Sequence, residues 1–191
     1  MRDLVLFMHV SLDGYVAGLN GEMDWINVNE AMFDYAAQRT READTALYGR
    51  VTFQMMDSYW PTAADQPNAT QHDIEHSRWY NQVEKVVLST TMPAAQRSQV
   101  KIVSQNSADE IRKLKQAAGK DILMFGSPTA AHSLMAHNLI DDYWLFVNPV
   151  LLGQGIPLFK SIKDTTTLTL IASKVFPPGV VCLHYTTSQD K

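Results

Sequence analysis

Two patterns of apolar and polar positions alternate along most of the chain. Short continuous apolar runs are typical of buried strands, whereas apolar residues three or four positions apart are typical of amphipathic helices. The runs predict strands at residues 4–10, 45–48, 85–88, 100–103, 121–125 and 142–147. The spaced pattern predicts helices at residues 30–43, 51–59, 72–82, 108–117 and 129–138, with a polar loop at 61–71. Strands that alternate with helices indicate an α/β architecture whose sheet is mostly parallel.

The last part of the chain has a different pattern. Residues 167–176 and 181–187 alternate apolar and polar positions on either side of Pro177-Pro178-Gly179, which predicts an antiparallel hairpin. No internal repeat, low-complexity segment or linker divides the 191 residues. We therefore predict one domain over residues 1–191, with a central mostly parallel sheet flanked by helices and a C-terminal antiparallel hairpin.

Composition narrows the classes of partner. The net charge is −4 with neutral histidines, which argues against a broad basic surface for nucleic acid. No apolar run approaches the roughly 20 residues of a membrane span, and the opening residues are too short for a signal peptide. Cys182 is the only cysteine, so an intrachain disulfide and a thiolate metal cluster are excluded. We expect a cytoplasmic protein that acts on a small molecule, with no nucleic-acid or membrane partner.

Three predicted strands end in glycine and hydroxyl residues. The three segments are Gly49-Arg50-Val51-Thr52, Ser89-Thr90-Thr91 and Gly126-Ser127-Pro128-Thr129. Ligands of open α/β sheets bind beyond the carboxyl ends of the strands, and free N–H groups at a helix start attract anions. The Arg50 guanidinium adds a two-pronged phosphate ligand. Several such loops favour a dinucleotide over a mononucleotide, although the G-x-G-x-x-G and Walker motifs are absent.

Two of the predicted helices begin at a serine. Ser107 is predicted to cap its helix, with Glu110 three residues later as the capping-box partner. Ser127 is a second candidate cap, followed by Pro128 at the first helical position. An ordinary helix also begins in this way, so the Ser127 junction alone leaves a plain turn and an anion site as alternatives.

These segments together resemble the dihydrofolate reductase-like superfamily, in the branch typified by the reductase domain of bacterial riboflavin biosynthesis. The family's opening resembles "VSLDGYVAG" at residues 10–18, and its Gly-Arg-x-Thr cofactor segment resembles "LYGRVTFQMM". Its next strand and loop resemble "KVVLSTT", and its C-terminal signature resembles "ILMFGSPTAAHSLMAHNLIDDYWLFVNPVLLGQGIPLF". The resemblance covers residues 3–186, without the deaminase-type zinc domain of some riboflavin enzymes, and so points to a stand-alone member.

The resemblance implies an NADPH-dependent reductase that forms a homodimer, with residues 144–150 and the hairpin as its candidate interface. It implies that the nicotinamide lies near small side chains at Val10, Ala17 and Gly18. It also implies phosphate contacts at Gly49, Arg50, Thr52, Ser89, Thr90, Gly126, Ser127, Pro128 and Thr129. The family's junction is often Gly-Gly, whereas this chain has Gly126-Ser127. The implied acceptor is a small planar heterocycle, pterin- or pyrimidine-like, with dihydrofolate and riboflavin precursors among the candidates.

Reduction of C=N or C=O needs a proton as well as a hydride, and a carboxylate of raised pKa is one usual donor. Dihydrofolate reductases have an acidic residue shortly after a tryptophan, at the start of the first helix, and Glu30 follows Trp25 in this way. Asp13 is the rival catalytic carboxylate, and Trp25 is a candidate to stack on a planar substrate. The alternatives are a dipole-stabilised helix start for Glu30, a turn aspartate for Asp13 and a core or rim tryptophan.

Two other functions remain open. His72-Asp73-Ile74-Glu75-His76 spells H-x-x-E-H, in which two histidines share a helix face as in zinc hydrolases, but a third ligand is required. The alternative for this segment is an exposed polar helix face that lies over the site as a lid. The other function is a non-catalytic dimeric protein that binds a nucleotide.

Overall fold

The computed structural model describes residues 1–93, 99–160, 162 and 164–187. Its strands are β1 (Leu4–Ser11), β2 (Tyr15–Ala17), β3 (Ala43–Gly49), β4 (Glu84–Leu88), β5 (Val100–Val103), β6 (Asp121–Phe125), β7 (Asp142–Asn148), β8 (Ile156–Pro157), β9 (Leu168–Phe176) and β10 (Val180–Thr187). Its helices are α1 (Glu30–Glu42), α2 (Arg50–Tyr59), α3 (Gln71–Gln82), α4 (Ser107–Gln116), α5 (Pro128–Met135) and the 3₁₀ helix η1 (Trp60–Asp65). None of the described helices has the length and apolar character needed to cross a membrane.

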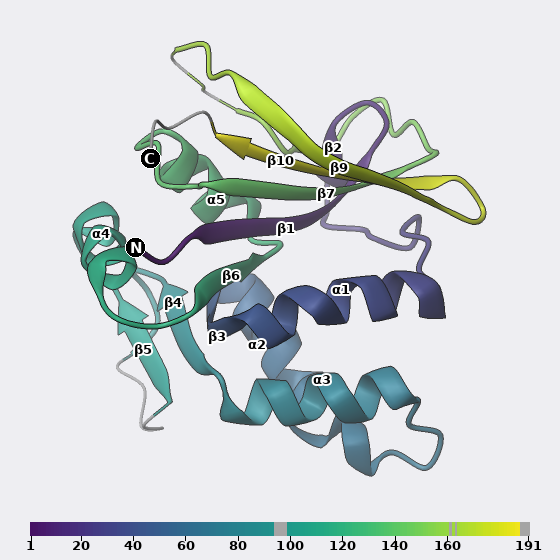
Figure 1. The fold of residues 1–191 in the computed structure, drawn as a ribbon, viewed down its shortest axis with the longest axis horizontal. Coiled ribbons are helices and arrows are strands. Elements are labelled where there is room, and N and C mark those ends of the chain that lie inside the picture. The colour runs from purple at the N-terminus through teal and green to yellow at the C-terminus, as the bar shows by residue number, and fades with distance from the viewer. Residues whose placement is uncertain (94–98, 161, 163, 188–191) are drawn as a thin grey trace.

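In the described residues, eight strands form one sheet in the order β5-β4-β3-β6-β1-β7-β10-β9 (Figure 1). The neighbours from β5 to β7 pair in parallel, whereas β10 pairs antiparallel with both β7 and β9. The predicted fold class, a mostly parallel sheet with a C-terminal antiparallel hairpin, is confirmed. The parallel strands are buried on both faces, which explains why they are continuous apolar runs in the sequence.

The two faces of the sheet have separate apolar clusters. On one face, Met32 of α1, Phe53 of α2 and Tyr80 of α3 pack with strand residues. On the other face, Ile111 of α4 and Leu134 of α5 pack with the alternate residues of the same strands. Successive strand side chains point to opposite faces, so each buried strand contributes to both clusters.

The helices that follow β3 and β6 leave the sheet in opposite directions. These strands are adjacent and parallel, with Leu47 opposite Met124. The next helix after β3 is α2, which packs through Phe53 on one face, whereas α5 after β6 packs through Leu134 on the other. Such a reversal opens a crevice beyond the strand ends, where ligands of α/β sheets bind. The crevice therefore lies between the first residues of α2 and α5.

Three local features differ from the sequence predictions. The predicted capping box at Ser107 is wrong, because Asn106 is the N-cap in a left-handed conformation and no side chain caps α4. The predicted loop at 61–71 begins with the 3₁₀ helix η1. A small sheet pairs β2 with β8, where a Cβ at Gly155 would lie 2.3 Å from the Ala17 carbonyl oxygen. Glycine is therefore needed for this close backbone approach.

Candidate functional site

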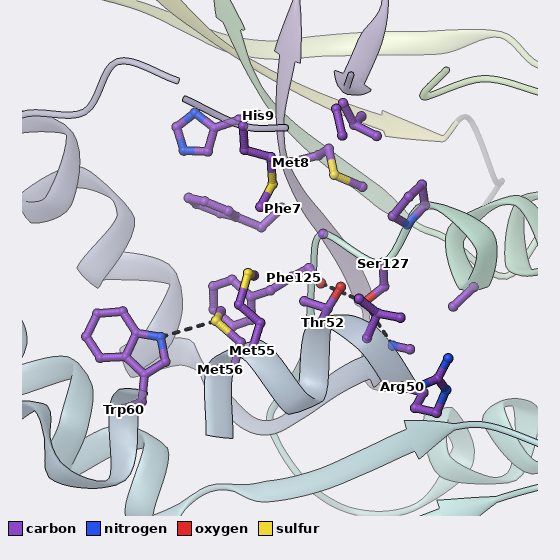
Figure 2. A pocket seen from close by; sticks show the side chains of 18 of the residues that line it. Phe7, Met8, His9, Arg50, Thr52, Met55, Met56, Trp60, Phe125 and Ser127 are labelled. Atoms are coloured by element: carbon purple, nitrogen blue, oxygen red, sulfur yellow. Dashed lines mark hydrogen bonds between the residues drawn. The ribbon is translucent and has the colours of Figure 1, made fainter. Parts of the chain in front are cut away.

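A cavity of about 1200 Å³ opens beyond the carboxyl ends of the central strands. One part, the polar end, is formed by residues 49–52, 88–91, 126–130, Val103, Ser104 and Ser107. The other part, the apolar end, is formed mainly by methionine and aromatic side chains, among them Phe7, Met32, Phe33, Met55, Trp60 and Phe125. Figure 2 shows Trp60 and Met56 on one side of the cavity and Arg50 and Ser127 on the other.

The polar end is a meeting point of helix starts. The N-cap residues of α2 and α5 are Gly49 and Ser127, and neither helix has a side-chain cap. A third uncapped helix, α4, contributes Ser107 to the same wall. The first N–H groups of a helix have no partner within the helix and carry its positive dipole end. This arrangement is suited to bind the phosphate groups of an anionic ligand.

The junction between β6 and α5 has an unusual backbone. Both Gly126 (φ 52°) and Ser127 (φ 62°) are in the left-handed region, which only glycine adopts without strain. The serine therefore keeps the conformation that a second glycine would allow. Its hydroxyl donates to the Phe125 carbonyl at 3.0 Å and accepts from the Gly49 N–H at 2.8 Å. The side chain that was expected to cap α5 instead joins the β6–α5 loop to the β3–α2 loop (Figure 2).

Most of the predicted cofactor residues lie in the cavity wall. Arg50 is exposed at its mouth and donates to Gln54 at 3.1 Å, so its guanidinium keeps other donors for a ligand. The Ser89 hydroxyl accepts from the N–H groups of Thr91 and Met92 and shapes its loop. The predicted residues that line the cavity are Ala17, Gly49, Arg50, Thr52, Ser89, Thr90, Gly126, Ser127, Pro128 and Thr129.

Two of the residues predicted near the nicotinamide do not line the cavity. Val10 is only 5% exposed and packs in the cluster on the α4 and α5 face. Gly18 lies beside Glu22, whose carboxylate approaches the place of a Cβ. On β1 the cavity is instead lined by Phe7, Met8 and His9.

The predicted catalytic carboxylates and the predicted stacking tryptophan also lie outside the cavity wall. Glu30 is exposed in the first turn of α1. Asp13 accepts from the N–H groups of Leu152 and Gly153, and its carboxylate holds that loop. The Trp25 indole N–H donates to the Glu22 carbonyl at 3.2 Å. Their roles stay predictions, and the contacts in the structure fit the structural alternatives.

The apolar end contains three histidines: His9, which the sequence analysis did not assign to a site, and His72 and His76, which it considered as zinc ligands or as part of a polar helix face. His9 stacks on Phe146 with ring centroids 5.1 Å apart. His72 stacks on Phe33 at 3.9 Å, and His76 lies 4.0 Å from the Trp60 ring. The signals were present in the sequence, since i and i+4 residues share a helix face and residues 7 and 9 share a strand face. The sequence did not show that this helix face and this strand face line the same cavity.

Burial keeps these imidazoles neutral at physiological pH. It lowers the pKa of His9 to about 4. Burial, and then the neighbouring His72, lower the pKa of His76 to about 3, and burial also lowers the pKa of His72. Burial lowers these pKa values because the charged imidazolium loses its hydration, whereas the neutral imidazole loses much less.

The H-x-x-E-H segment does not form a metal centre in the described part of the chain. No group of three His, Cys, Asp or Glu side chains there could hold a metal ion. The alternative of an exposed polar face is also wrong, because His76, Ser77 and Tyr80 are buried. Helix α3 packs on α1 and η1, and its histidine face forms a wall of the cavity.

Comparison with known proteins shows a consistent set of relatives. The sequence profile of the RibD C-terminal domain matches residues 2–182. The uncharacterized protein YyaP of Bacillus subtilis (strain 168) is 32% identical over 188 residues, which are 96% of this chain and 94% of YyaP.

Solved structures extend the similarity to the whole fold. A Shewanella sp. PV-4 protein named for riboflavin biosynthesis superposes with a TM-score of 0.74 at 26% identity, over 99% of this chain and all of its own. The Enterococcus faecalis dihydrofolate reductase, solved with NADP(H) and RAB-propyl, superposes with a TM-score of 0.64 at 15% identity, over 98% and 97% of the two chains. The second similarity shows the fold alone.

We predict that two replacements of Ser127 differ in stability. Ser127→Ala leaves the Gly49 N–H without its partner, and this loss should lower the free energy of unfolding by about 1–3 kcal/mol. The left-handed strain stays in this variant. Ser127→Gly loses the same hydrogen bonds but removes the strain, so it should be about 1 kcal/mol less destabilising. Urea unfolding measures both. Ser133→Ala, at an exposed serine of α5, is the control, and an equal or larger loss for Ser127→Gly would contradict this account.

We also predict that His76 makes stability depend on acid. Its folded pKa of about 3 lies below its ordinary value of 6.5, so its contribution is complete above pH 6.5 and is lost as the pH falls. The loss should be about 1.4 kcal/mol per pH unit. Between about pH 6.5 and pH 5, the unfolding free energy of His76→Phe should fall less steeply by that amount, whereas between about pH 6.5 and pH 8 the two proteins should have the same slope. The exposed His137→Phe is the control, and an unchanged slope in His76→Phe would refute the prediction.

Proposed function

The chain belongs to the RibD C-terminal domain family, and from this membership we propose that it is a reductase that binds NADPH and reduces a small planar molecule. The observation that carries the proposal is the pair of uncapped helix starts, α2 and α5, that face one crevice and are joined by the Ser127 hydroxyl. A dinucleotide has separate phosphate groups for these separate loops. The dihydrofolate reductase with the same fold was solved with NADP(H).

The residues of the polar end fit such a cofactor. The N–H groups at the starts of α2 and α5 would hold the pyrophosphate, and Gly49 and Gly126 both line the cavity at these starts. Arg50, with Ser89 and Thr90, would hold the 2′-phosphate of the adenosine ribose. The cavity is larger than the roughly 300–1,000 Å³ of common ligand sites, and so has space for a cofactor and a second molecule.

A bound reduced nicotinamide supplies a hydride, and the protein has to position the acceptor and exclude water. Phe7, His9 and Ala17 would enclose the junction between the two ends of the cavity. Among the described residues that line the cavity, Glu75 alone carries a carboxylate, and it lies 3.8 Å from the Arg41 guanidinium. We propose that the accompanying proton comes from solvent.

Arg50 provides the test of the cofactor proposal. We expect Arg50→Gln to weaken NADPH binding about 10- to 100-fold, because a charge-assisted contact to phosphate contributes about 1.5–3 kcal/mol. NADH, which lacks the 2′-phosphate, should bind to the variant and the wild type alike. Titrations followed by tryptophan fluorescence measure both dissociation constants.

The control for this titration is Arg112→Gln, which removes an exposed arginine of α4 that pairs with Asp109. It should leave both affinities unchanged. An equal loss of NADH and NADPH affinity in Arg50→Gln would contradict the proposed contact between Arg50 and the 2′-phosphate. No fluorescence response of the wild type to millimolar NADPH would overturn the reductase proposal and leave a protein that does not bind this cofactor.

We also propose that the protein is a homodimer that associates through β9. The predicted interface combined residues 144–150 with the hairpin, but Trp144 and Phe146 are buried within the sheet of one chain. The hairpin's edge strand β9, by contrast, exposes Leu170, Ile171 and Val175. An edge strand with exposed apolar side chains requires a cover, and a second copy of the same strand provides it.

Sedimentation velocity tests this interface. The wild type should sediment as a dimer, and Ile171→Glu should shift it to the monomer, because a carboxylate would be buried without a partner. Leu12→Glu, which places the same charge on an exposed loop residue, should keep the dimer. A monomeric wild type would contradict the proposal.

A further inference from the structure

The apolar end of the cavity offers a ligand almost no charge. Its wall is built from the thioether and aromatic side chains of α1, α2, η1 and β1. Phe7 packs against Phe125 and Phe146 with centroids 5.6 and 4.8 Å apart, which forms a continuous aromatic floor. Met55 and Met56 face this floor from α2 (Figure 2). Flat aromatic rings and polarizable thioethers favour a planar apolar ligand.

The histidines in this wall are neutral groups. The His72 ring stacks on the Phe33 ring, and the His76 ring packs at a tilt against the Trp60 ring. Burial lowers the pKa of both histidines. The Nε2 atom of His76 has no hydrogen-bond partner among the described residues and is shielded from solvent. A wall that keeps its imidazoles uncharged does not neutralise an anionic substrate.

Three charged residues line this end, Arg41, Glu75 and Arg78, and the side chains of all three are exposed. The Arg41 guanidinium lies 3.8 Å from the Glu75 carboxylate, with side chains 71% and 43% exposed. Gln71 also donates to Glu75, at 2.6 Å. Glu75 is therefore the one carboxylate among the described lining residues, and it is exposed beside Arg41, whereas a pterin would require a carboxylate to bind its ring nitrogen atoms.

Moving a charged group into such a wall is costly. A carboxylate or phosphate loses its hydration, and an apolar wall returns neither a counter-charge nor hydrogen bonds. Binding of a neutral planar ring removes mainly apolar surface from water, and this removal favours binding. The lining residues therefore favour uncharged ligands over charged ligands of the same shape.

We infer that the acceptor is an uncharged, planar and largely apolar compound, and not a phosphorylated pyrimidine or a pterin that needs a carboxylate partner. The inference rests on the proposed function, because it names the substrate class of the same cavity. It assigns the methionine and aromatic wall a role in selection, with the phosphate-binding groups confined to the polar end.

A matched pair of probes tests the inference by binding alone. Quinolin-2-one is neutral, and its 4-carboxylate has the same ring with one negative charge. We expect isothermal titration calorimetry without cofactor to show at least about tenfold tighter binding of the neutral probe, a difference of 1.4 kcal/mol. Equal or tighter binding of the carboxylate, or no binding of the neutral probe at millimolar concentration, would overturn the inference.

Variants link the preference to the apolar end. Met55→Lys adds a cation at a wall residue that is 46% exposed and tolerates the change, and Met23→Lys (41% exposed) does so from another segment. Each should improve carboxylate binding relative to the neutral probe at least about tenfold. Gln116→Lys, with the same charge on exposed α4 outside the cavity, should keep the wild-type ratio. An unchanged ratio in both methionine variants would refute the inference.

The two proposals fail in different ways. The probe titrations contain no NADPH, so they are independent of the cofactor site. NADPH binding without a preference for the neutral probe would leave the reductase proposal and remove the acceptor class. A preference for the neutral probe without NADPH binding would remove the reductase proposal and leave only a site that selects uncharged rings.

Discussion

The Ser127 hydroxyl holds together the part of the molecule on which the site depends. It lies between the Phe125 carbonyl at the end of β6 and the Gly49 N–H at the start of α2. Helices α2 and α5 leave adjacent strands toward opposite faces of the sheet, and the Ser127 hydroxyl bonds the two loops from which they start. A buried residue with a left-handed backbone thus connects the two sides of the crevice.

The two ends of the cavity follow from this geometry. Backbone N–H groups and hydroxyls collect where helices begin, so the polar end lies at the starts of α2, α4 and α5. The helix sides, by contrast, present the side chains that pack on the sheet, and these are methionines, aromatic rings and neutral histidines. This division is consistent with the proposed function, in which phosphate groups bind at one end and an uncharged ring at the other.

The fold was predictable because its strands are buried on both faces and therefore appear as separate apolar runs. The phosphate-suited loops, such as the one that begins at Gly49, were predictable from residue type and their place at strand ends. The roles of single side chains were harder to predict. Ser127 was expected to cap α5, but its left-handed backbone turns the hydroxyl toward β3. Glu30 matches the spacing of a catalytic acid, yet spacing does not say which way the first turn of α1 faces, and His76 was hidden in a polar segment whose tertiary partner was unknown.

We propose that the starts of α2 and α5 form a dinucleotide site at the point where the helices diverge. A crystal structure of the protein with NADPH would test this proposal. We expect the pyrophosphate between Gly49 and Ser127, with the adenosine ribose toward Arg50 and the nicotinamide toward Phe7 and His9. A nucleotide bound elsewhere on the molecule, or an empty crevice in crystals grown at saturating NADPH, would contradict it.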